Sequence, residues 1–169
     1  MNQASTPPAI DFYFDFSCPY AYLGSTQLAR IEAETGRPVR YKPFLLGGVF
    51  RALDQAQNMS TTLSEPKKRH NRADLIRWAS WFEVPLHTPM RHPNRTVEAL
   101  RALLACPQPR WREVIEALYR VYWVDGGDIS DSDVLRDGLR RLELDADAVL
   151  ARAASPDIKR ELFERTDEA

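Results

Sequence analysis

The apolar positions at the start of the chain follow a two-residue alternation that then gives way to helical spacing. Residues 10–16 alternate and are rich in aromatic side chains, which is typical of a half-buried strand. Pro19 suits the first position of a helix because it has no N–H to leave unpaired, so we predict a helix over 20–35 that ends at Gly36. A second strand is predicted over 38–46. Strand, helix and strand in this order predict a βαβ unit with parallel strands.

After residue 47 the apolar residues recur at helical spacing only. Ser130 to Asp133 has the spacing of an N-terminal capping box. Because two parallel strands alone rarely make a stable sheet, we expect the fold to need strands beyond Ala169. The predicted helices cover residues 67–82, 96–105, 110–124, 133–142, 146–153 and a last stretch from Ser155-Pro156 to the end.

The composition is that of an ordinary globular protein. It is 44% hydrophobic and 28% charged, and 23 Lys and Arg nearly balance 24 Asp and Glu. This balance argues against the broad basic surface of a nucleic-acid binder. The N-terminus lacks the pattern of a secretory signal, and no apolar stretch is long enough to span a bilayer. We therefore predict a cytoplasmic protein with no nucleic-acid and no membrane partner.

Cys18 is the main candidate for chemistry. It stands between the aromatic strand and the helix that Pro19 opens, where backbone N–H groups and the helix dipole favour an anion. We therefore predict that the pKa of Cys18 is lowered from the value of about 8.5 of a free thiol. The alternative is an inert small residue at a strand end. Cys106, before Pro107, is expected to be a buried apolar residue, and a disulfide between the two cysteines is disfavoured.

Three further groups have both an ordinary and a functional interpretation. Five basic residues open the helix over 67–82, where a solvated helix face is the ordinary interpretation: Lys67, Lys68, Arg69, His70 and Arg72. Aromatic residues at helical spacing further along are either core or the wall of an aromatic substrate pocket: Trp78, Trp81 and Phe82. His87 and His92 are single histidines in proline-rich connections, and no spacing of ligands predicts a metal site.

Several motifs run in the same order as in a known family. Besides residues 11–24 they are Lys42-Pro43-Phe44-Leu45-Leu46-Gly47-Gly48-Val49-Phe50, Lys67 with Asp74-Leu75 and Trp78, Pro93-Asn94-Arg95-Thr96, and Tyr122-Trp123-Val124 leading to Asp128-Ile129-Ser130-Asp131. The chain thus resembles the 2-hydroxychromene-2-carboxylate isomerases and the kappa-class glutathione transferases, in the DsbA-like branch of the thioredoxin fold. The resemblance implies an α/β, thioredoxin-like fold. Residues 8–46 would be its N-terminal βαβ half, 47–154 an inserted all-helical domain, and 155–169 a helix leading back to C-terminal strands that this chain lacks.

The resemblance also implies that glutathione is the cofactor. The family usually carries Ser where this chain has Cys18 before Pro19, and the DsbA-type enzymes carry a second Cys where this chain has Ala21, so the site is a monothiol. Counting back from Asp74, Lys67 aligns with the family lysine that contacts glutathione, whereas Lys68 would need a one-residue gap. We therefore expect Lys67→Ala to weaken binding while Lys68→Ala serves as a control. The family asparagine falls on Asn58 with an insertion or on Gln55 without one, and Asn58 is preferred. Cys18, Pro19, Asn58 and Lys67 are thus the predicted glutathione-binding residues, with Cys18 the catalytic one.

The activity that the resemblance implies is a glutathione-dependent cis–trans isomerisation in the catabolism of naphthalene-like aromatic compounds. The substrate would be 2-hydroxychromene-2-carboxylate, whose open-chain form is a small aromatic oxo-acid, and the protein would be a homodimer. One alternative is a monothiol disulfide oxidoreductase or a kappa-like glutathione transferase in which Cys18 itself reacts. Another is a glutathione-binding or interaction module without activity.

Overall fold

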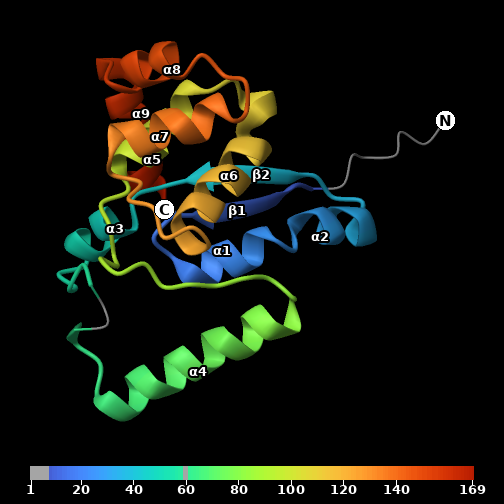
Figure 1. Ribbon diagram of the computed structural model, residues 1–169, viewed down its shortest axis with the longest axis vertical. Coiled ribbons are helices and arrows are strands. Elements are labelled where there is room, and N and C mark those ends of the chain that lie inside the picture. The colour runs from blue at the N-terminus through green and yellow to red at the C-terminus, as the bar shows by residue number, and fades with distance from the viewer. Residues whose placement is uncertain (1–7, 59–60) are drawn as a thin grey trace.

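A two-stranded parallel sheet and its crossover helices form the N-terminal part of the molecule. The computed structural model describes residues 8–58 and 61–169. Within them β1 (Ile10–Phe14) pairs with β2 (Val39–Pro43), with Ile10 opposite Val39. Two helices, α1 (Pro19–Ser25) and α2 (Leu28–Thr35), connect the strands along one side of the sheet (Figure 1). The βαβ unit predicted from the alternation is confirmed.

The crossover consists of two helices where the sequence predicts one. Ser25 Oγ donates to the carbonyl of Tyr22 and Thr26 Oγ1 to that of Leu23, both at 2.7 Å. Side-chain hydroxyls that bond to nearby carbonyls compete with the continuation of a helix, so the chain breaks between Ser25 and Leu28. The predicted end is confirmed, because Gly36 closes α2 with a left-handed φ of 65°.

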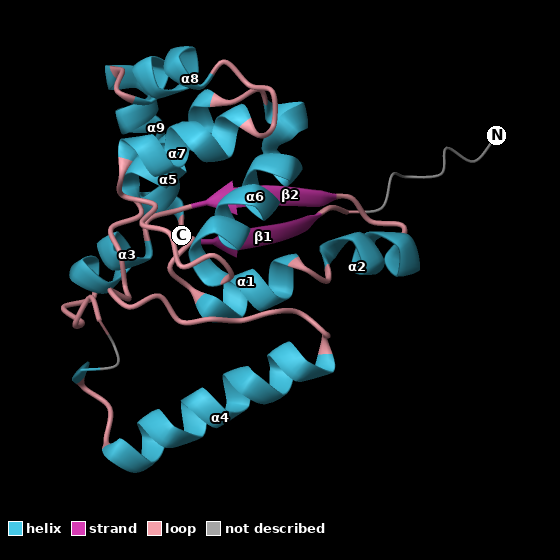
Figure 2. Ribbon diagram, viewed as in Figure 1, coloured by secondary structure: helices cyan, strands magenta, loops and turns pink. Residues whose placement is uncertain are grey.

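Helices joined by loops make up the rest of the described chain (Figure 2). The helix α3 (Leu46–Ala52) is absent from the sequence-based prediction, because Gly47 and Gly48 lower the local helix propensity. Tertiary structure explains why Gly48 stands there, since a Cβ at this position would lie 2.9 Å from Thr166 Cγ2. The other helices, found within a few residues of their predicted bounds, follow: α4 (Glu65–Trp81), α5 (Val97–Ala105), α6 (Trp111–Trp123), α7 (Ser132–Arg140), α8 (Ala146–Ala153) and α9 (Pro156–Glu168).

The cap of α7 lies one residue away from the predicted capping box. The carboxylate of Asp131 accepts from the N–H of Asp133 at 2.8 Å, so Asp131 and not Ser130 is the N-cap. Ser130 instead donates, through both its N–H and its hydroxyl, to Asp128 Oδ1. The prediction of the cap was therefore wrong by one position, because Asp128 had already engaged Ser130.

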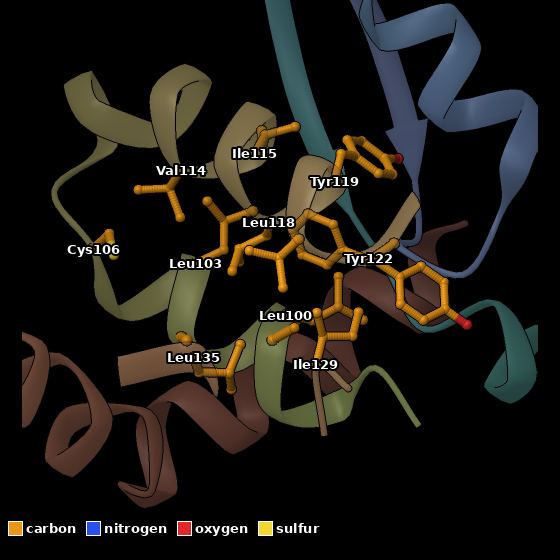
Figure 3. Close-up of a cluster of buried hydrophobic side chains, with 14 of the residues drawn as sticks. Leu100, Leu103, Cys106, Val114, Ile115, Leu118, Tyr119, Tyr122, Ile129 and Leu135 are labelled. Atoms are coloured by element: carbon orange, nitrogen blue, oxygen red, sulfur yellow. The ribbon is translucent and has the colours of Figure 1, made fainter. Parts of the chain in front are cut away.

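The core lies where α6 crosses the sheet and meets α5, α7 and α9. One face of α6 is apolar and buried, as Figure 3 shows for Val114, Ile115 and Leu118 packed with Leu103 of α5. Tyr119 on α6 continues this core toward the sheet through ring contacts with Phe14 and Phe16. Cys106 is 4% exposed, which confirms that it is a buried apolar residue.

Helix α4 lies along the edge of the molecule, apart from this core (Figure 1). Its buried part is small, since among its side chains only Ala79 belongs to the core of the described residues. Trp81 is 78% exposed, and Trp78 is 44% exposed and stacks on Phe82. The interpretation of these tryptophans as core was therefore wrong. In the part of the chain that the structure describes, no helix combines the length and apolarity needed to cross a bilayer.

Candidate functional site

A cavity of about 880 Å³ opens at the carboxyl end of β1, beside the start of α1. Its wall comes from residues 17–20, from α3 and the segment after it, from α4, from the connection between α4 and α5, and from Trp123 at the end of α6. Cys18 and Pro19, two of the predicted glutathione-binding residues, lie on this wall. A pocket at the carboxyl end of a parallel strand is a common place for a ligand.

Cys18 is the N-cap of α1, with extended backbone angles of −87° and 112°. Burial raises the pKa of its thiol, and the neighbouring Asp15 adds to this, while hydrogen bonds from the N–H groups of Ala21 and Tyr20 pull in the opposite direction. The prediction of a lowered pKa was therefore wrong. Helix α1 has only seven residues, and desolvation of the sulfur outweighs its N-terminal N–H groups.

Asp15, three residues before Cys18, is a buried carboxyl group that joins the walls of the site. It is 1% exposed and accepts four hydrogen bonds. Ser17 donates its N–H at 2.9 Å and its hydroxyl at 3.0 Å to Oδ1, and the N–H of Leu46 and the hydroxyl of Thr96 donate to Oδ2 at 2.9 and 3.1 Å. Burial raises the pKa of Asp15 and these four bonds oppose the rise. One side chain thus fixes the loop before Cys18, the start of α3 and the start of α5 relative to one another.

Helix α4 supplies the cationic part of the wall. Lys68 and Arg72 line the cavity together with Leu75 and Ile76, whereas Lys67 is exposed outside it. The ammonium of Lys68 lies 2.7 Å from Glu65. Lys68, rather than Lys67, therefore lies where its ammonium can reach a ligand in the cavity. Lys68, the control for Lys67 in the sequence-based prediction, becomes the candidate for ligand binding.

The segment after α3 forms the opposite wall. Asn58, the preferred candidate for the family asparagine, lines the cavity, and Gln55 does not. Asn58 also lines a neighbouring hollow of about 730 Å³ together with Arg51 and Arg95. The site thus offers an amide and several cations, which suit a flexible ligand with carboxylates.

Two of the family motifs meet behind this wall. Asn94 donates its side-chain amide to Asp128 Oδ1 at 2.9 Å, and its N–H to the hydroxyl of Tyr122 at the same distance. This joins the connection before α5 to the end of α6 and to the loop before α7. Motifs that are far apart in the sequence are therefore hydrogen-bonded to one another at one place in the fold.

Sequence reasoning missed several residues of the site. Asp15 had a usable signal, since a lone carboxylate between Phe14 and Phe16 implies a buried polar group that needs partners. Lys68 and Arg72 are four positions apart and so share a helix face, which Lys67 does not. Across residues 8–58 and 61–169, no group of three or more His, Cys, Asp or Glu side chains is arranged to hold a metal ion.

The residues present fit glutathione. Glutathione carries two carboxylates, one ammonium and a thiol, and the cavity sets the cations of α4 and the amide of Asn58 near the N-terminus of α1. A thiol placed beside Cys18 would meet the same N–H groups that face the Cys18 sulfur.

Comparisons with known proteins agree with this geometry. A model of the DSBA-like thioredoxin domain matches residues 9–169. The chain is 34% identical over 149 residues to 2-hydroxychromene-2-carboxylate isomerase of Sphingobium xenophagum, covering 87% of this chain and 74% of that protein. It is 30% identical over 123 residues to glutathione S-transferase kappa 1 of Caenorhabditis elegans, covering 69% of this chain and 53% of that protein. A solved structure of 2-hydroxychromene-2-carboxylate isomerase superposes with a TM-score of 0.79 at 21% identity, over 94% of this chain and 77% of the other.

The fold and site thus define a thioredoxin-like protein of the DsbA type. The chain belongs to the DSBA-like thioredoxin domain family, and within it to the family of 2-hydroxychromene-2-carboxylate isomerase. The resemblance deduced from the motifs and the thioredoxin-like fold class are both confirmed. The division at residues 46 and 154 stays a prediction.

Proposed function

We propose that this protein is a glutathione-dependent isomerase that interconverts 2-hydroxychromene-2-carboxylate and its open-chain benzylidenepyruvate in the breakdown of aromatic compounds. One observation carries the proposal: a single cavity combines Cys18 at a helix start, the cations of α4 and an apolar wall. The name of the relative that shares 34% identity supports the substrate, and the name of the kappa-class relative supports the cofactor.

The residues of the chain divide the work of such a reaction. Lys68 and Arg72 hold carboxylates, and Leu75, Ile76 and Trp123 provide an apolar surface for an aromatic ring. The N–H groups at the start of α1, with the Cys18 thiol as a weak donor, orient and stabilise a sulfur anion. When bound, glutathione supplies a thiolate that can add to a conjugated double bond and leave it again, which permits rotation about that bond.

The proposal is tested by adding 2-hydroxychromene-2-carboxylate to the purified chain with and without glutathione and following absorbance. We expect turnover only with glutathione present. Cys18→Ser should retain it, because the related enzymes carry Ser at this position and a hydroxyl also donates a hydrogen bond. Turnover that is equal without glutathione, or no turnover at all, contradicts the proposal.

A second candidate is a monothiol disulfide oxidoreductase or a kappa-like transferase, favoured by the free thiol of Cys18 on the cavity wall. In that case Cys18 would form a mixed disulfide with oxidised glutathione. Mass spectrometry after incubation should then show one adduct, which Cys18→Ser abolishes and Cys106→Ser leaves in place. If Cys18→Ser removes isomerase turnover while glutathione still binds, Cys18 is itself a nucleophile.

The compartment and the assembly belong to the same proposal. The cytoplasm is the compartment in which thiols such as Cys18 and glutathione stay reduced. A homodimer is proposed from the family resemblance, and light scattering on the purified chain tests it by its mass.

A further inference from the structure

Two of the three histidines of the chain line the cavity and are held by successive residues at the end of α6. His87 Nδ1 lies 3.0 Å from the carbonyl oxygen of Val124, and the N–H of His87 donates to the carbonyl of Trp123 at 2.7 Å. A carbonyl oxygen only accepts, so Nδ1 of His87 carries a proton. In the neutral ring, Nε2 of His87 is then a bare base.

His92 is held in the opposite way. The Nδ1 of His92 lies 2.9 Å from the hydroxyl of Tyr122. The oxygen of this hydroxyl accepts a hydrogen bond from the N–H of Asn94 at 2.9 Å. Tyr122 is fully buried, and burial raises its pKa to about 12, so its hydroxyl keeps its proton and needs an acceptor. His92 Nδ1 is that acceptor, and Nε2 of His92 therefore carries the ring hydrogen. Burial also lowers the pKa of His92, which keeps the ring neutral.

Other titratable groups on this wall are poor bases near neutral pH. The pKa of the Cys18 thiol is raised, and that of Tyr20 is raised to about 12 by burial and by its hydrogen bond to Asp74 at 2.9 Å. Lys68 and Arg72 are cations. Of these groups, the histidines are the ones suited to moving a proton at neutral pH.

We propose that His87 and His92 act as a pair that opens the hemiketal ring of the substrate, with His87 Nε2 as the base and His92 Nε2–H as the hydrogen-bond donor to the ring oxygen. The inference rests on the proposed function, because it assigns residues to that reaction. It gives the two histidines different tasks, although both line the same cavity and both are held by residues at the end of α6.

The proton and electron balance of the step is simple. His87 Nε2 removes the proton of the hemiketal hydroxyl, and the electron pair of that O–H bond forms the new carbonyl. The bond between this carbon and the ring oxygen breaks, and its electron pair stays on the oxygen as a phenolate. The His92 N–H stabilises this developing charge, in the manner of a neutral imidazole acting as electrophile. The phenolate then takes the proton back from the His87 imidazolium, so no other reactant is needed.

Nitrogen NMR of the histidine rings tests the two tautomers on the protein alone. We expect uniformly ¹⁵N-labelled protein at neutral pH to show His87 protonated at Nδ1 and His92 protonated at Nε2. The signals are assigned with His70→Gln, His87→Gln and His92→Gln. If both cavity histidines carry their proton on the same nitrogen, the assignment of tasks is wrong.

Kinetics test the tasks themselves, with glutathione present. His87→Gln can hydrogen-bond but cannot take a proton, so we expect kcat to fall about 100-fold. His92→Leu removes the donor and should lower kcat by about 100-fold as well, whereas His92→Gln keeps an N–H and should lose less. His70→Gln, an exposed residue of α4 away from the cavity, is the matched control and should leave kcat unchanged.

The outcomes separate this inference from the proposed function. If both His87→Gln and His92→Leu turn over substrate at the wild-type rate, the pair is overturned and the isomerase proposal stands. If the wild-type protein shows no turnover, the proposed function fails, and the ring signals decide on the pair. Shifts of His87 and His92 but not of His70 on adding the hemiketal acid then support binding by the pair, and unshifted signals overturn it.

Discussion

At the residue scale, the chemistry of Cys18 depends on its surroundings more than on its place in the chain. Its sulfur meets N–H groups at the start of α1, which favour a thiolate, but burial and the nearby carboxyl group of Asp15 disfavour one and prevail. A thiol with a raised pKa stays protonated near neutral pH, so it is a weak nucleophile but keeps the S–H that can donate a hydrogen bond. This agrees with a role in orienting another sulfur.

Iodoacetamide alkylation of Cys18 against pH should therefore give an apparent pKa above that of a free cysteine. The Asp15→Asn variant should lower it, because the neighbouring carboxyl group contributes to the rise. The measurement is made in the Cys106→Ser background, where Cys18 is the remaining thiol. Burial raises the pKa of the Cys106 thiol to about 11. An apparent pKa of Cys18 below that of a free cysteine contradicts this account.

Lys68 and Lys67 make a second residue-scale comparison, since they are adjacent and identical in type. Lys68→Ala should weaken glutathione binding by roughly three- to ten-fold, because a partly exposed cation is partly screened by water and salt. Lys67→Ala should have little effect, because Lys67 lies outside the cavity. Calorimetric titration of both variants at two salt concentrations measures the difference. Equal, small losses in the two variants would mean that neither lysine contacts the ligand.

At the scale of elements, the site depends on a few bonds that join helix starts and strand ends. Asp15 links the end of β1 to the first N–H of α3 and to Thr96 before α5. Thr166 of α9 accepts the N–H of Leu45 at 3.0 Å, just after β2. These contacts hold the walls of the cavity although the elements are far apart in the sequence.

The burial of Asp15 has a predictable effect on stability. Its pKa is raised in the folded state above its ordinary value of 3.8, so the folded protein binds the proton more tightly than the unfolded chain does. Its contribution to the free energy of unfolding is fully present below 3.8 and is lost as the pH rises through the raised value. Relative to Asp15→Asn, the wild-type protein should gain stability as the pH falls from 7 toward 4.

Urea unfolding of both proteins across this pH range measures the effect. Asp54→Asn, at an exposed position after α3, controls for the loss of one carboxylate and should follow the wild type in its pH dependence. If the difference between wild type and Asp15→Asn does not change with pH, the raised pKa of Asp15 is wrong.

At the scale of the whole molecule, the core around α6 stabilises the fold, whereas the candidate functional site lies at the edge of this core. Leu118 is 1% exposed at the centre of that core, whereas Trp81 at the end of α4 is 78% exposed. The cavity lies between these two regions, since Trp123 comes from α6 and Ile76 from α4.

Leu118→Ala should therefore lower the free energy of unfolding by about 2–5 kcal/mol, because it removes buried methyl groups and leaves a cavity. Trp81→Ala should lower it by much less, although it removes a larger side chain. Urea unfolding followed by circular dichroism measures both. Comparable losses in the two variants would mean that α4 packs more tightly than the structure shows.

The sequence by itself determined the features that neighbouring residues decide. The alternation before Cys18 gave the first strand, Gly36 ended the crossover, and the spacing of apolar residues placed α6 and its buried face. These features depend on the pleat of a strand, on the freedom of glycine and on the helical repeat, which act over a few residues. The ordered motifs also gave the family.

Tertiary structure alone decided the features that depend on burial and on distant partners. The raised pKa of Cys18 comes from desolvation, and Gly48 is required by Thr166, which lies more than one hundred positions away in the chain. The choice of Lys68 over Lys67 depends on where α4 lies beside the cavity. The opposite tautomers inferred for the two cavity histidines depend on which partner the end of α6 offers to each ring, a carbonyl or a hydroxyl. No local pattern contains this information, because desolvation and hydrogen bonding are set by atoms that only folding brings together.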